Sequence, residues 1–336
     1  MKRNFTVIDL FCGAGGFSYG FKKNNFKILL GIDNNEDAIE TYKHNIKAKT
    51  LLYDINNLNL KILKKNINSK CVDVLIAGLP CRPYSRANKK IREEQHHEGN
   101  LYKKLVEFIN GLKPKIFLIE NVPEFVSNGK SKAYNYLINI LNNFIINYNI
   151  IDLADYGLPQ HRKRVIIYGI NKQLSNTNFN FPKPIINNKN YVKVEEIFKN
   201  LPKPCSHHNL HNHYAVNIEE NTQKNIINIP PGGNYKNIPN LSQKKYHENY
   251  YYKLDPLKPS KTLTSSVYKS HFSHPYCNRI LTVRECASLQ GFPIDYEFKS
   301  NTDSIISMYN QVINAVPPIF SEIIAKNVFD FLSINI

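Results

Sequence analysis

The sequence predicts an α/β protein with a doubly wound sheet and a second, smaller domain that is rich in loops. Up to residue 170, short apolar and β-branched segments alternate with helical patterns, which is typical of a parallel sheet with helices on both faces. A glycine-rich turn follows the first of these segments. From Asn171 onward Pro, Asn, Tyr and His dominate, and no clear helical period returns before Val283.

The first strand is expected over residues 5–10 and runs directly into a turn that contains Gly13 and Gly15. Such glycines let the backbone approach a ligand closely at the amino end of a helix. A second strand, at residues 28–32, ends in Asp33, about 20 residues after the first glycine, where a carboxylate can accept hydrogen bonds from both hydroxyls of a ribose.

The later elements continue the alternation. A helix is expected over residues 36–46, where apolar residues recur on one face, and a strand at residues 51–53 ends in Asp54, a second acid at the same sheet edge. The other expected elements are strands at 72–76, 116–119 and 165–168 and helices at 101–112, 283–289 and 319–332.

Cys81 is the candidate nucleophile. It lies in a Pro-Cys-Arg-Pro turn directly after a buried strand, which delivers it to the carboxyl edge of the sheet, where ligands bind. A thiol with a pKa near about 8.5 reacts well only beside positive charge, which Arg82 and Arg86 could supply. The alternative for an isolated cysteine of this kind is a small buried residue in a strand-to-loop turn.

Glu120 ends the next strand, so its carboxylate and the Cys81 thiol are expected at neighbouring strand ends. A carboxylate there is often a helix cap or an ion-pair partner, but its pairing with the thiol favours a general acid. Arg162 and Arg164 alternate at the start of a buried strand, are expected to face one way, and need anionic or carbonyl partners. The competing interpretation of residues 1–60 is an NAD-binding fingerprint, but no nicotinamide chemistry needs Cys81 with Glu120.

The charge of the chain indicates a polyanionic partner. Lys and Arg number 44 against 27 Asp and Glu, a formal charge of +17, which favours nucleic acid. The 6 cysteines have no paired spacing, no secretory leader follows Met1, and no apolar run reaches the roughly 18 residues of a membrane span. These features predict a reduced cytoplasm or nucleus.

These residues resemble the bacterial-type DNA (cytosine-5-)-methyltransferase family, whose motifs occur here in the family's order. The matching segments are Asp9-Leu10-Phe11 with its glycines, Pro80-Cys81, Glu120-Asn121-Val122, Gln160-x-Arg162-x-Arg164, Arg279 to Glu285, Gln290 to Pro293, and Asn314 to Pro317. The resemblance implies a Rossmann-like methyltransferase sheet in residues 1–170 plus 306–336, and a target-recognition domain with a hinge in residues 171–305.

The resemblance also implies the chemistry. Cys81 would add to carbon 6 of a cytosine that is flipped out of the duplex, while Glu120 protonates the ring. Carbon 5 would then take the methyl group of S-adenosylmethionine, leaving S-adenosylhomocysteine. Arg164 and Arg162 would bind the base carbonyl and a nearby phosphate. The base that removes the carbon 5 proton is not assigned.

The cofactor pocket that the resemblance implies combines residues from both ends of the chain and contains no metal. Phe11 would cover the adenine, Gly13 and Gly15 the methionine end, Asp33 the ribose and Asp54 the adenine amine. The complete implied set is Asp9, Phe11, Gly13, Gly15, Asp33, Asn34, Asp54, Ile55, Pro80, Leu101, Asn314, Ala315 and Val316.

The resemblance implies that the partner is double-stranded DNA and that the protein binds it as a monomer. It also implies a prokaryotic cytoplasmic protein that associates with the nucleoid when bound to DNA and is paired in function with a cognate restriction endonuclease. The predicted contact residues are Arg82, Ser85, Arg86, Gly232, Gly233, Lys261 and Thr262. One branch of the family modifies transfer RNA, but the sizeable region from 171 to 275 favours duplex DNA.

Two positions depart from the family pattern. Arg82 stands where Gln is common, and Ile313 stands where Gly is common. These departures leave open a DNA-binding homologue without catalysis. The histidines between Cys205 and His213 could bind zinc, but their spacing fits no known ligand set, so a polar loop is the favoured interpretation.

Overall fold

The computed structural model describes residues 4–67, 69, 71–84, 100–126, 131–175, 179–187, 190–204, 210–264 and 266–336. Ser85, Arg86 and most of the cysteine and histidine cluster after Pro204 lie outside these residues. The chain divides into two compact units. The sheet unit comprises Met1–Asp152, Lys163–Lys183 and Pro318–Ile336, and the second unit comprises Leu153–Arg162 and Pro184–Pro317. The assignment of a catalytic and a target-recognition role to two domains stays a prediction.

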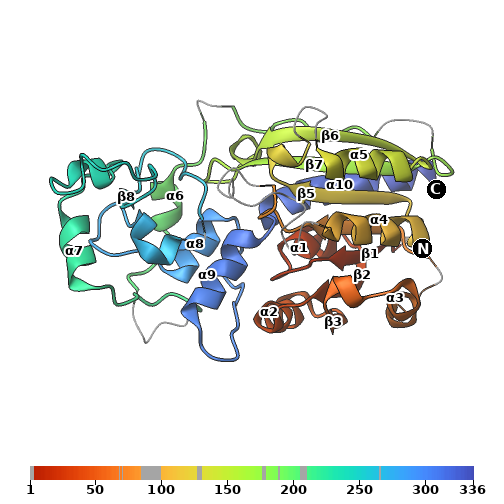
Figure 1. The fold of residues 1–336 in the computed structure, drawn as a ribbon, viewed down its shortest axis with the longest axis horizontal. Coiled ribbons are helices and arrows are strands. Elements are labelled where there is room, and N and C mark those ends of the chain that lie inside the picture. Colours follow the sequence, from red (N-terminus) through yellow and green to blue (C-terminus); the bar gives the residue numbers. More distant parts are fainter. Residues whose placement is uncertain are drawn as a thin grey trace. The chain divides into compact units, whose positions relative to one another are not determined.

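The sheet unit is built on a 7-stranded sheet in the order β3-β2-β1-β4-β5-β7-β6 (Figure 1). Its strands are β1 (Thr6–Leu10), β2 (Lys27–Asp33), β3 (Thr50–Leu52), β4 (Val74–Gly78), β5 (Ile116–Asn121), β6 (Phe144–Asp152) and β7 (Lys163–Asn171). Strands β1 to β5 are parallel, whereas β7 runs antiparallel to both β5 and β6. The strand order reverses between β1 and β4, the point where doubly wound sheets bind ligands, so the predicted fold is confirmed.

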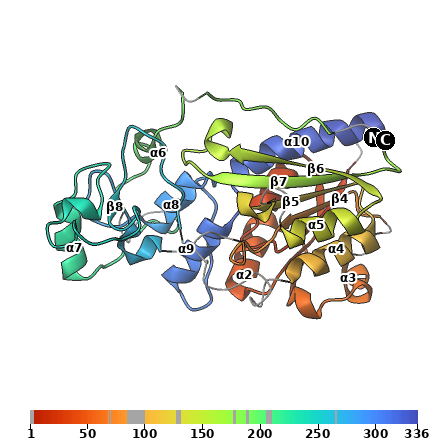
Figure 2. The ribbon, with the colours of Figure 1, turned by 45° about the horizontal axis from the view of Figure 1, so that its top comes forward.

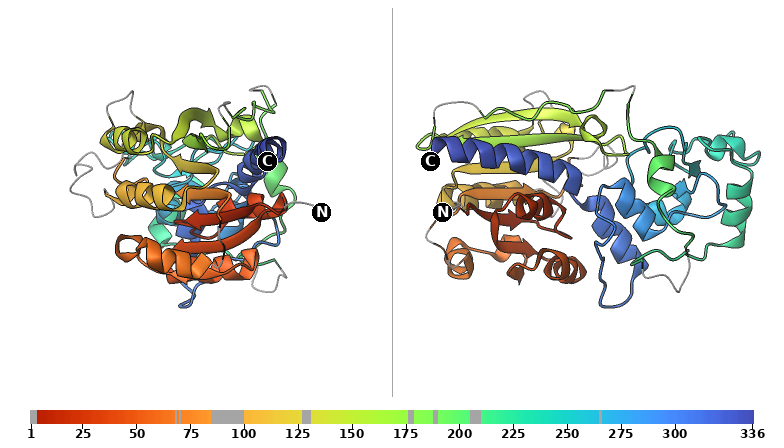
Figure 3. Two further views of the ribbon diagram at one scale, coloured as in Figure 1. Left: turned by 90° about the vertical axis from the view of Figure 1, so that its right-hand side faces the viewer. Right: turned by 180° about the vertical axis from the view of Figure 1, so that it is seen from behind.

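Helices cover both faces of this sheet. They are α1 (Gly16–Lys23), α2 (Glu36–Ile46), α3 (Leu60–Ile67), α4 (Leu101–Leu112), α5 (Lys132–Ile140) and α10 (Pro318–Asn335), with the short helices η1 (Ile55–Asn57) and η4 (Pro123–Phe125). Figures 2 and 3 show α4 and α5 on one face and α1 and α10 on the other. The bounds of α2 and α4 match the prediction, whereas α3, α5 and β6 were not predicted.

The carboxyl-terminal helix returns to the first elements of the chain. Helix α10 packs along α1, and Phe329 contacts both Phe5 and Phe26 in edge-on ring pairs at 5.4 and 5.7 Å. The contact between the two helices is close because Gly20 of α1 has no side chain: a Cβ there would lie 2.1 Å from the backbone carbon of Ser321. Helix α10 therefore belongs to the sheet unit, although it is the last element of the chain.

The second unit contains short elements joined by long loops. They are η6 (Leu153–Tyr156), α6 (Val194–Phe198), α7 (Glu220–Ile227), η7 (Tyr235–Asn237), β8 (Tyr252–Lys253), η8 (Val267–His271), β9 (Phe272–Ser273), α8 (Val283–Leu289) and α9 (Ile305–Asn314). Sequence periodicity found α8 with its observed bounds but missed α6 and α7. Helix α6 has only 5 residues, and α7 buries only Thr222 and Ile226, so neither carries a readable apolar face.

Buried charges organise the second unit around α8. Arg279 donates two hydrogen bonds to the Glu285 carboxylate, at 2.8 and 2.7 Å, and Glu285 also accepts from the backbone of Thr282 in a capping box. Arg284 is fully buried and donates to the carbonyl oxygens of His211, Pro293 and Tyr296. The motif from Arg279 to Glu285 therefore holds this unit together.

The approach of α1 to α10 predicts a steric effect. In Gly20→Ala the new methyl group meets backbone that cannot yield, so the free energy of unfolding should fall by about 1–3 kcal/mol despite the better helix propensity of alanine. In the matched variant Gly111→Ala the methyl group meets only the flexible end of Leu60. Urea unfolding should therefore give Gly111→Ala a stability near that of the parent, and equal losses in both variants would contradict the explanation.

Candidate functional site

The sheet register brings the predicted site residues of the sheet unit to one edge. Asp33 ends β2, Gly78 ends β4 shortly before Cys81, and Glu120 is the register partner of Gly78. The Cys81 and Glu120 strand ends are therefore neighbours, as predicted.

The glycine turn after β1 is held by a hydrogen bond to Asp33 and leaves open space at Gly13. Phe11, Gly13 and Gly15 have positive φ values of 58°, 49° and 92°. The backbone N–H of Gly13 donates to Asp33 at 2.8 Å, and a Cβ built on Gly13 would meet no atom of the described residues within 4 Å. The other Asp33 oxygen accepts from the backbone of Asn35 at 2.9 Å, and burial raises the pKa of this carboxyl group. The turn therefore leaves room for a ligand beside a fixed carboxyl group.

A buried polar chain supports this turn. Asp9 is fully buried in β1 and accepts a hydrogen bond from the Ser18 hydroxyl at 2.7 Å, and Ser18 also contacts the Tyr42 hydroxyl at 2.7 Å. The second Asp9 oxygen has no hydrogen-bond partner among the described residues. Burial, together with the nearby charge of Asp33, raises the pKa of Asp9 to about 8, although the Ser18 hydrogen bond opposes this shift. Asp9 is therefore mostly protonated at pH 7.

The other predicted cofactor residues of the sheet unit lie beside this turn or on the loops that follow the strands. Asp54 caps η1 through the backbone of Asn56 at 2.9 Å, and Tyr53 donates to the Asp33 carbonyl, which keeps the two acidic strand ends together. Ile55 is buried, Asn34 is exposed, Pro80 is half-buried, and Leu101 is buried at the start of α4.

Cys81 sits in a turn that buried groups hold in place. The Cys81 carbonyl accepts from the backbone of Tyr84 at 3.0 Å, and the Tyr84 ring packs edge-on against Phe125 at 4.7 Å. Asn121 is fully buried; its amide donates to the Leu79 carbonyl at 3.2 Å, and its oxygen accepts from the backbone of Val122 at 2.8 Å. Asn121 therefore ties the end of β5 to the segment that carries the half-exposed cysteine.

Glu120 pairs with Arg164 from β7. Their side chains are only 9% and 12% exposed, and the Arg164 Nε lies 2.8 Å from a Glu120 carboxylate oxygen. Arg164 also donates to the carbonyl of Lys163 at 2.7 Å. This arrangement brings a carboxylate and a guanidinium together next to the strand end that carries Cys81.

Arg162 contacts different groups. It is buried in the second unit and donates to the carbonyl oxygens of Ile313 and Ala315, at 3.0 and 3.5 Å. Gln290 also donates to the Ala315 carbonyl, at 2.8 Å, and itself accepts from Gln160 at 2.9 Å. Arg162 is therefore a positioning residue for the segment that contains Asn314, Ala315 and Val316, and its contact with a base stays a prediction.

The predicted DNA-contacting residues of the second unit share one region. Gly232 and Lys261 line a single cavity, and the Thr262 hydroxyl donates to the carbonyl of His161, which lines the same cavity. Gly233 follows Gly232 in a loop that is hydrogen-bonded to Lys253. In the sheet unit, Arg82 is exposed in the Cys81 turn.

Sequence reasoning assigned no role to Asn121 or Gln160. It treated Ser18 only as a small residue of the glycine turn and Tyr42 only as part of an apolar helix face. Asn121 and Gln160 fall inside motifs, which was the only available signal. The contacts of Ser18 and Tyr42 join α1 to α2 and cannot be read from local spacing.

Comparisons with known proteins agree with this geometry. The family model for C-5 cytosine-specific DNA methylases matches residues 5–330. A Methanocaldococcus jannaschii protein described as a type II methyltransferase is 33% identical over 96% of this chain and 98% of its own length. The type II methyltransferase M.NgoFVII of Neisseria gonorrhoeae is 30% identical over 98% of this chain and 87% of its own.

A solved structure extends the likeness to the fold. A prophage-encoded Escherichia coli protein described as a DNA modification methyltransferase has a TM-score of 0.79 at 23% identity, covering 98% of this chain and 100% of its own. The chain belongs to the C-5 cytosine-specific DNA methylase family and is an enzyme of that class.

The family fixes the coarse features of the reaction. Methyltransferases of this kind use S-adenosylmethionine and act on DNA, and type II methyltransferases pair with restriction enzymes. No group of metal-binding side chains occurs among the described residues. No helix in the described part of the chain has the length and apolar character needed to cross a membrane.

The raised pKa of Asp9 predicts a pH-dependent stability. Between the ordinary carboxyl pKa of about 3.9 and the folded value of about 8, the folded protein holds a proton that the unfolded chain releases. The free energy of unfolding should therefore fall as pH rises through this window, by at most about 1.4 kcal/mol per pH unit from this group. Asp9→Asn does not titrate but keeps an acceptor for Ser18, so it should remove this contribution.

The measurement is chemical unfolding between pH 5 and pH 9, values that bracket the folded pKa of about 8. The exposed carboxylate of Asp330, 3.3 Å from Lys326, provides the matched variant Asp330→Asn. Its stability curve should run parallel to that of the parent. A parallel curve for Asp9→Asn would show that the Asp9 carboxyl does not carry the proton.

The contacts of Asn121 predict a loss of catalysis at constant cofactor binding. Asn121→Ala leaves the Leu79 carbonyl without its buried donor, which costs about 1–3 kcal/mol and loosens the Cys81 turn. We expect kcat for methyl transfer to fall about tenfold or more, with an unchanged KM for S-adenosylmethionine. Gly20→Ala, destabilised elsewhere, should keep its kcat. Equal kcat values in the two variants would show that Asn121 contributes to stability only and does not position the Cys81 turn for catalysis.

Proposed function

We propose that this chain transfers a methyl group from S-adenosylmethionine to carbon 5 of a flipped-out cytosine in a specific double-stranded DNA sequence. The reaction proceeds through a covalent Cys81 adduct, and the enzyme, a monomer, acts as the modification half of a restriction-modification system. The observation that carries the proposal is the Cys81 strand end beside the ion pair of Glu120 and Arg164.

Cys81 makes carbon 5 nucleophilic. Its thiolate adds to carbon 6 while Glu120, in its protonated form, delivers a proton to ring nitrogen 3. The electrons of the carbon 5–carbon 6 double bond then form an enamine double bond between carbons 4 and 5. Bound S-adenosylmethionine supplies an electrophilic methyl group on sulfonium. After methylation, loss of the carbon 5 proton, cleavage of the bond to Cys81 and return of the ring nitrogen 3 proton to Glu120 restore the aromatic ring and the free enzyme.

Arg164 supports this chemistry electrostatically. Its guanidinium is held by Glu120 at 2.8 Å in a largely buried position, where charge is weakly screened. From there it can donate to the base carbonyl as negative charge develops on the ring. Arg162 contributes by fixing the segment from Asn314 to Val316 through the carbonyls of Ile313 and Ala315.

The residues at the sheet edge fit the cofactor. The open space over Gly13 suits the methionine end, Phe11 the adenine, and Asp33 and Asp54 the ribose and the adenine amine. Protonated Asp9 stabilises the turn without adding negative charge below it. Asn34, Ile55, Pro80, Leu101, Asn314, Ala315 and Val316 complete the proposed set.

DNA binding must offset the cost of flipping the base, a few kcal/mol. The formal charge of +17 favours phosphate contacts, and Arg82, Gly232, Gly233, Lys261 and Thr262 are the proposed contact residues that the structure describes. Ser85 and Arg86 are proposed from the sequence alone.

A transfer assay tests the proposal. Purified enzyme and labelled S-adenosylmethionine are incubated with unmethylated genomic DNA or bulk transfer RNA, and the products are hydrolysed to identify 5-methylcytosine. Label is expected in DNA only. Cys81→Ser should abolish transfer yet still bind the cofactor, and Glu120→Gln should lower kcat by about 10²- to 10⁴-fold.

Other outcomes distinguish the alternatives. Label confined to RNA would overturn the DNA substrate, and transfer that survives Cys81→Ser would overturn the covalent adduct. DNA binding without label in either nucleic acid would favour the non-catalytic homologue that Arg82 and Ile313 left open.

A further inference from the structure

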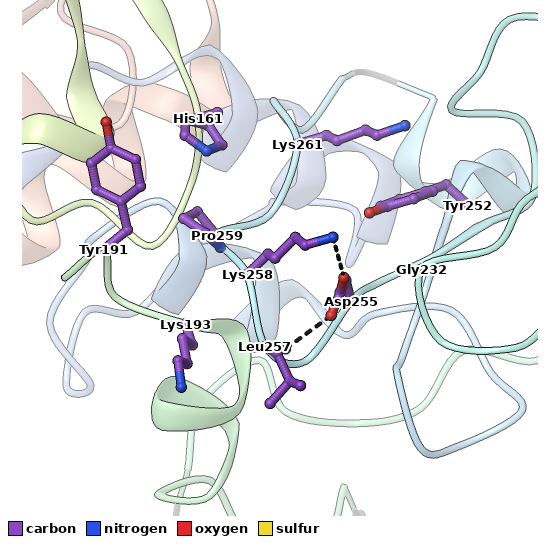
Figure 4. A pocket seen from close by; sticks show the side chains of 10 residues that line it. All are labelled: His161, Tyr191, Lys193, Gly232, Tyr252, Asp255, Leu257, Lys258, Pro259 and Lys261. Atoms are coloured by element: carbon purple, nitrogen blue, oxygen red, sulfur yellow. Dashed lines mark hydrogen bonds and ion pairs between the residues drawn. The ribbon is translucent and has the colours of Figure 1, made fainter. Parts of the chain in front are cut away.

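The second unit contains a cavity that the methyl transfer chemistry does not use. Its volume is about 580 Å³, within the ~300–1,000 Å³ common for ligand pockets. Figure 4 shows that its walls come from the segments around His161, Tyr191 and Gly232 and from the loop that contains Asp255 and Lys258.

Backbone hydrogen bonds fix the walls of this cavity in advance. The first N–H of α6, from Val194, donates to the Lys258 carbonyl at 3.1 Å. The His161 N–H donates to the Ser260 carbonyl at 2.8 Å, and the Gly232 N–H to the Lys253 carbonyl at 3.0 Å. A site formed in this way loses little conformational freedom when it binds a ligand.

The charges in the cavity favour an anion. Among the described residues that line it, Lys258 and Lys261 outnumber the single carboxylate of Asp255. Lys193 also lines the cavity, but its nitrogen lies 3.8 Å from the Glu195 carboxylate. Lys261 lies over the Tyr252 ring, with its nitrogen 4.1 Å from the ring centre, which restricts its position. Lysines arranged as point charges suit a phosphate.

Lys258 can change its partner. Its nitrogen lies 3.0 Å from one Asp255 oxygen, but its side chain is 75% exposed, and such ion pairs add little stability. The other Asp255 oxygen accepts from the backbone of Leu257 at 3.0 Å and so holds the turn independently of Lys258. The turn can therefore keep its shape when Lys258 leaves.

We propose that this cavity binds one backbone phosphate of the substrate DNA and that Lys258 exchanges the Asp255 carboxylate for that phosphate. This inference rests on the proposed action on DNA and extends it with a defined anchoring site. Asp255 keeps Lys258 extended over the cavity until DNA arrives, at the cost of part of the binding affinity.

The test measures the affinity of the full chain for a mixed-sequence duplex as a function of salt concentration, by fluorescence anisotropy. Lys258→Ala should weaken binding and reduce the magnitude of the slope of log K against log salt by about 0.9, the value for one phosphate contact. The matched variant Lys224→Ala removes a lysine from another exposed ion pair of the same unit, 2.6 Å from Glu220 on α7, and should keep the slope. Equal slopes in the two variants would overturn the proposal.

A second comparison tests the exchange itself. Asp255→Asn keeps the acceptor for Leu257 but releases Lys258, so DNA affinity should rise severalfold, and this rise should vanish when Lys258→Ala is also present. Glu220→Gln is the matched removal of a carboxylate from a lysine. If Asp255→Asn strengthens binding no more than Glu220→Gln does, the exchange is refuted.

The source of the anion is tested separately, by calorimetric titration of the full chain with inorganic phosphate. The expected result is no saturable binding. The proposal would be refuted if inorganic phosphate bound saturably, Lys258→Ala abolished that binding, and the salt slope of DNA binding were the same in Lys258→Ala and the parent. The cavity would then be a site for a free anion and not for a DNA phosphate. Because Cys81→Ser should keep the parental salt slope, failure of this inference and failure of the methyl transfer proposal are distinguishable.

Discussion

The ion pair between Glu120 and Arg164 depends on the direction of one strand. Glu120 is the last residue but one of β5, at the carboxyl edge of the sheet, where a parallel neighbour would also end. Strand β7 is antiparallel instead, with Ile166 as the register partner of Glu120, so β7 begins at that edge. Arg164, near the start of β7, therefore lies beside Glu120. The reversal of β7 therefore brings Arg164, the last residue of the basic run, next to Glu120.

The carboxyl groups at the two ends of this sheet edge have different surroundings. At the glycine turn after β1, burial raises the pKa values of Asp9 and Asp33, which limits negative charge beside this turn. On the side of Cys81, the Glu120 carboxylate lies against a guanidinium, and removal of one partner would leave the other charge buried alone. The sheet edge thus carries two kinds of acidic residue, which are buried carboxyl groups with raised pKa values beside the glycine turn and an ion-paired carboxylate beside Cys81.

Much of the fold could be predicted from periodicity, because α2, α4 and α8 carry clear apolar faces and the parallel strands are continuous apolar runs. Strand β6 was missed because it is a partly exposed edge strand. Its sequence is neither a continuous apolar run nor a regular alternation of polar and apolar residues. The thiol and its neighbouring carboxylate were predictable because Cys81 closely follows one buried strand and Glu120 lies near the end of another. The role of Asn121 was not, since it depends on a hydrogen bond to Leu79, 42 residues earlier. The raised pKa of Asp9 was not either, since it follows mainly from burial in the folded protein.

The two arginines of the Gln160-x-Arg162-x-Arg164 motif show a limit of local pattern reasoning. Strand alternation holds only within a strand, and β7 begins at Lys163, so it does not govern Arg162. The chain passes from the second unit into the sheet unit directly after Arg162 and again after Pro317. Arg162 donates to the carbonyls of Ile313 and Ala315. Its guanidinium therefore links the two segments of the second unit that precede these boundaries. Arg162 therefore acts through the backbone of its own unit, whereas Arg164 acts on a carboxylate, because the boundary between the units falls between them.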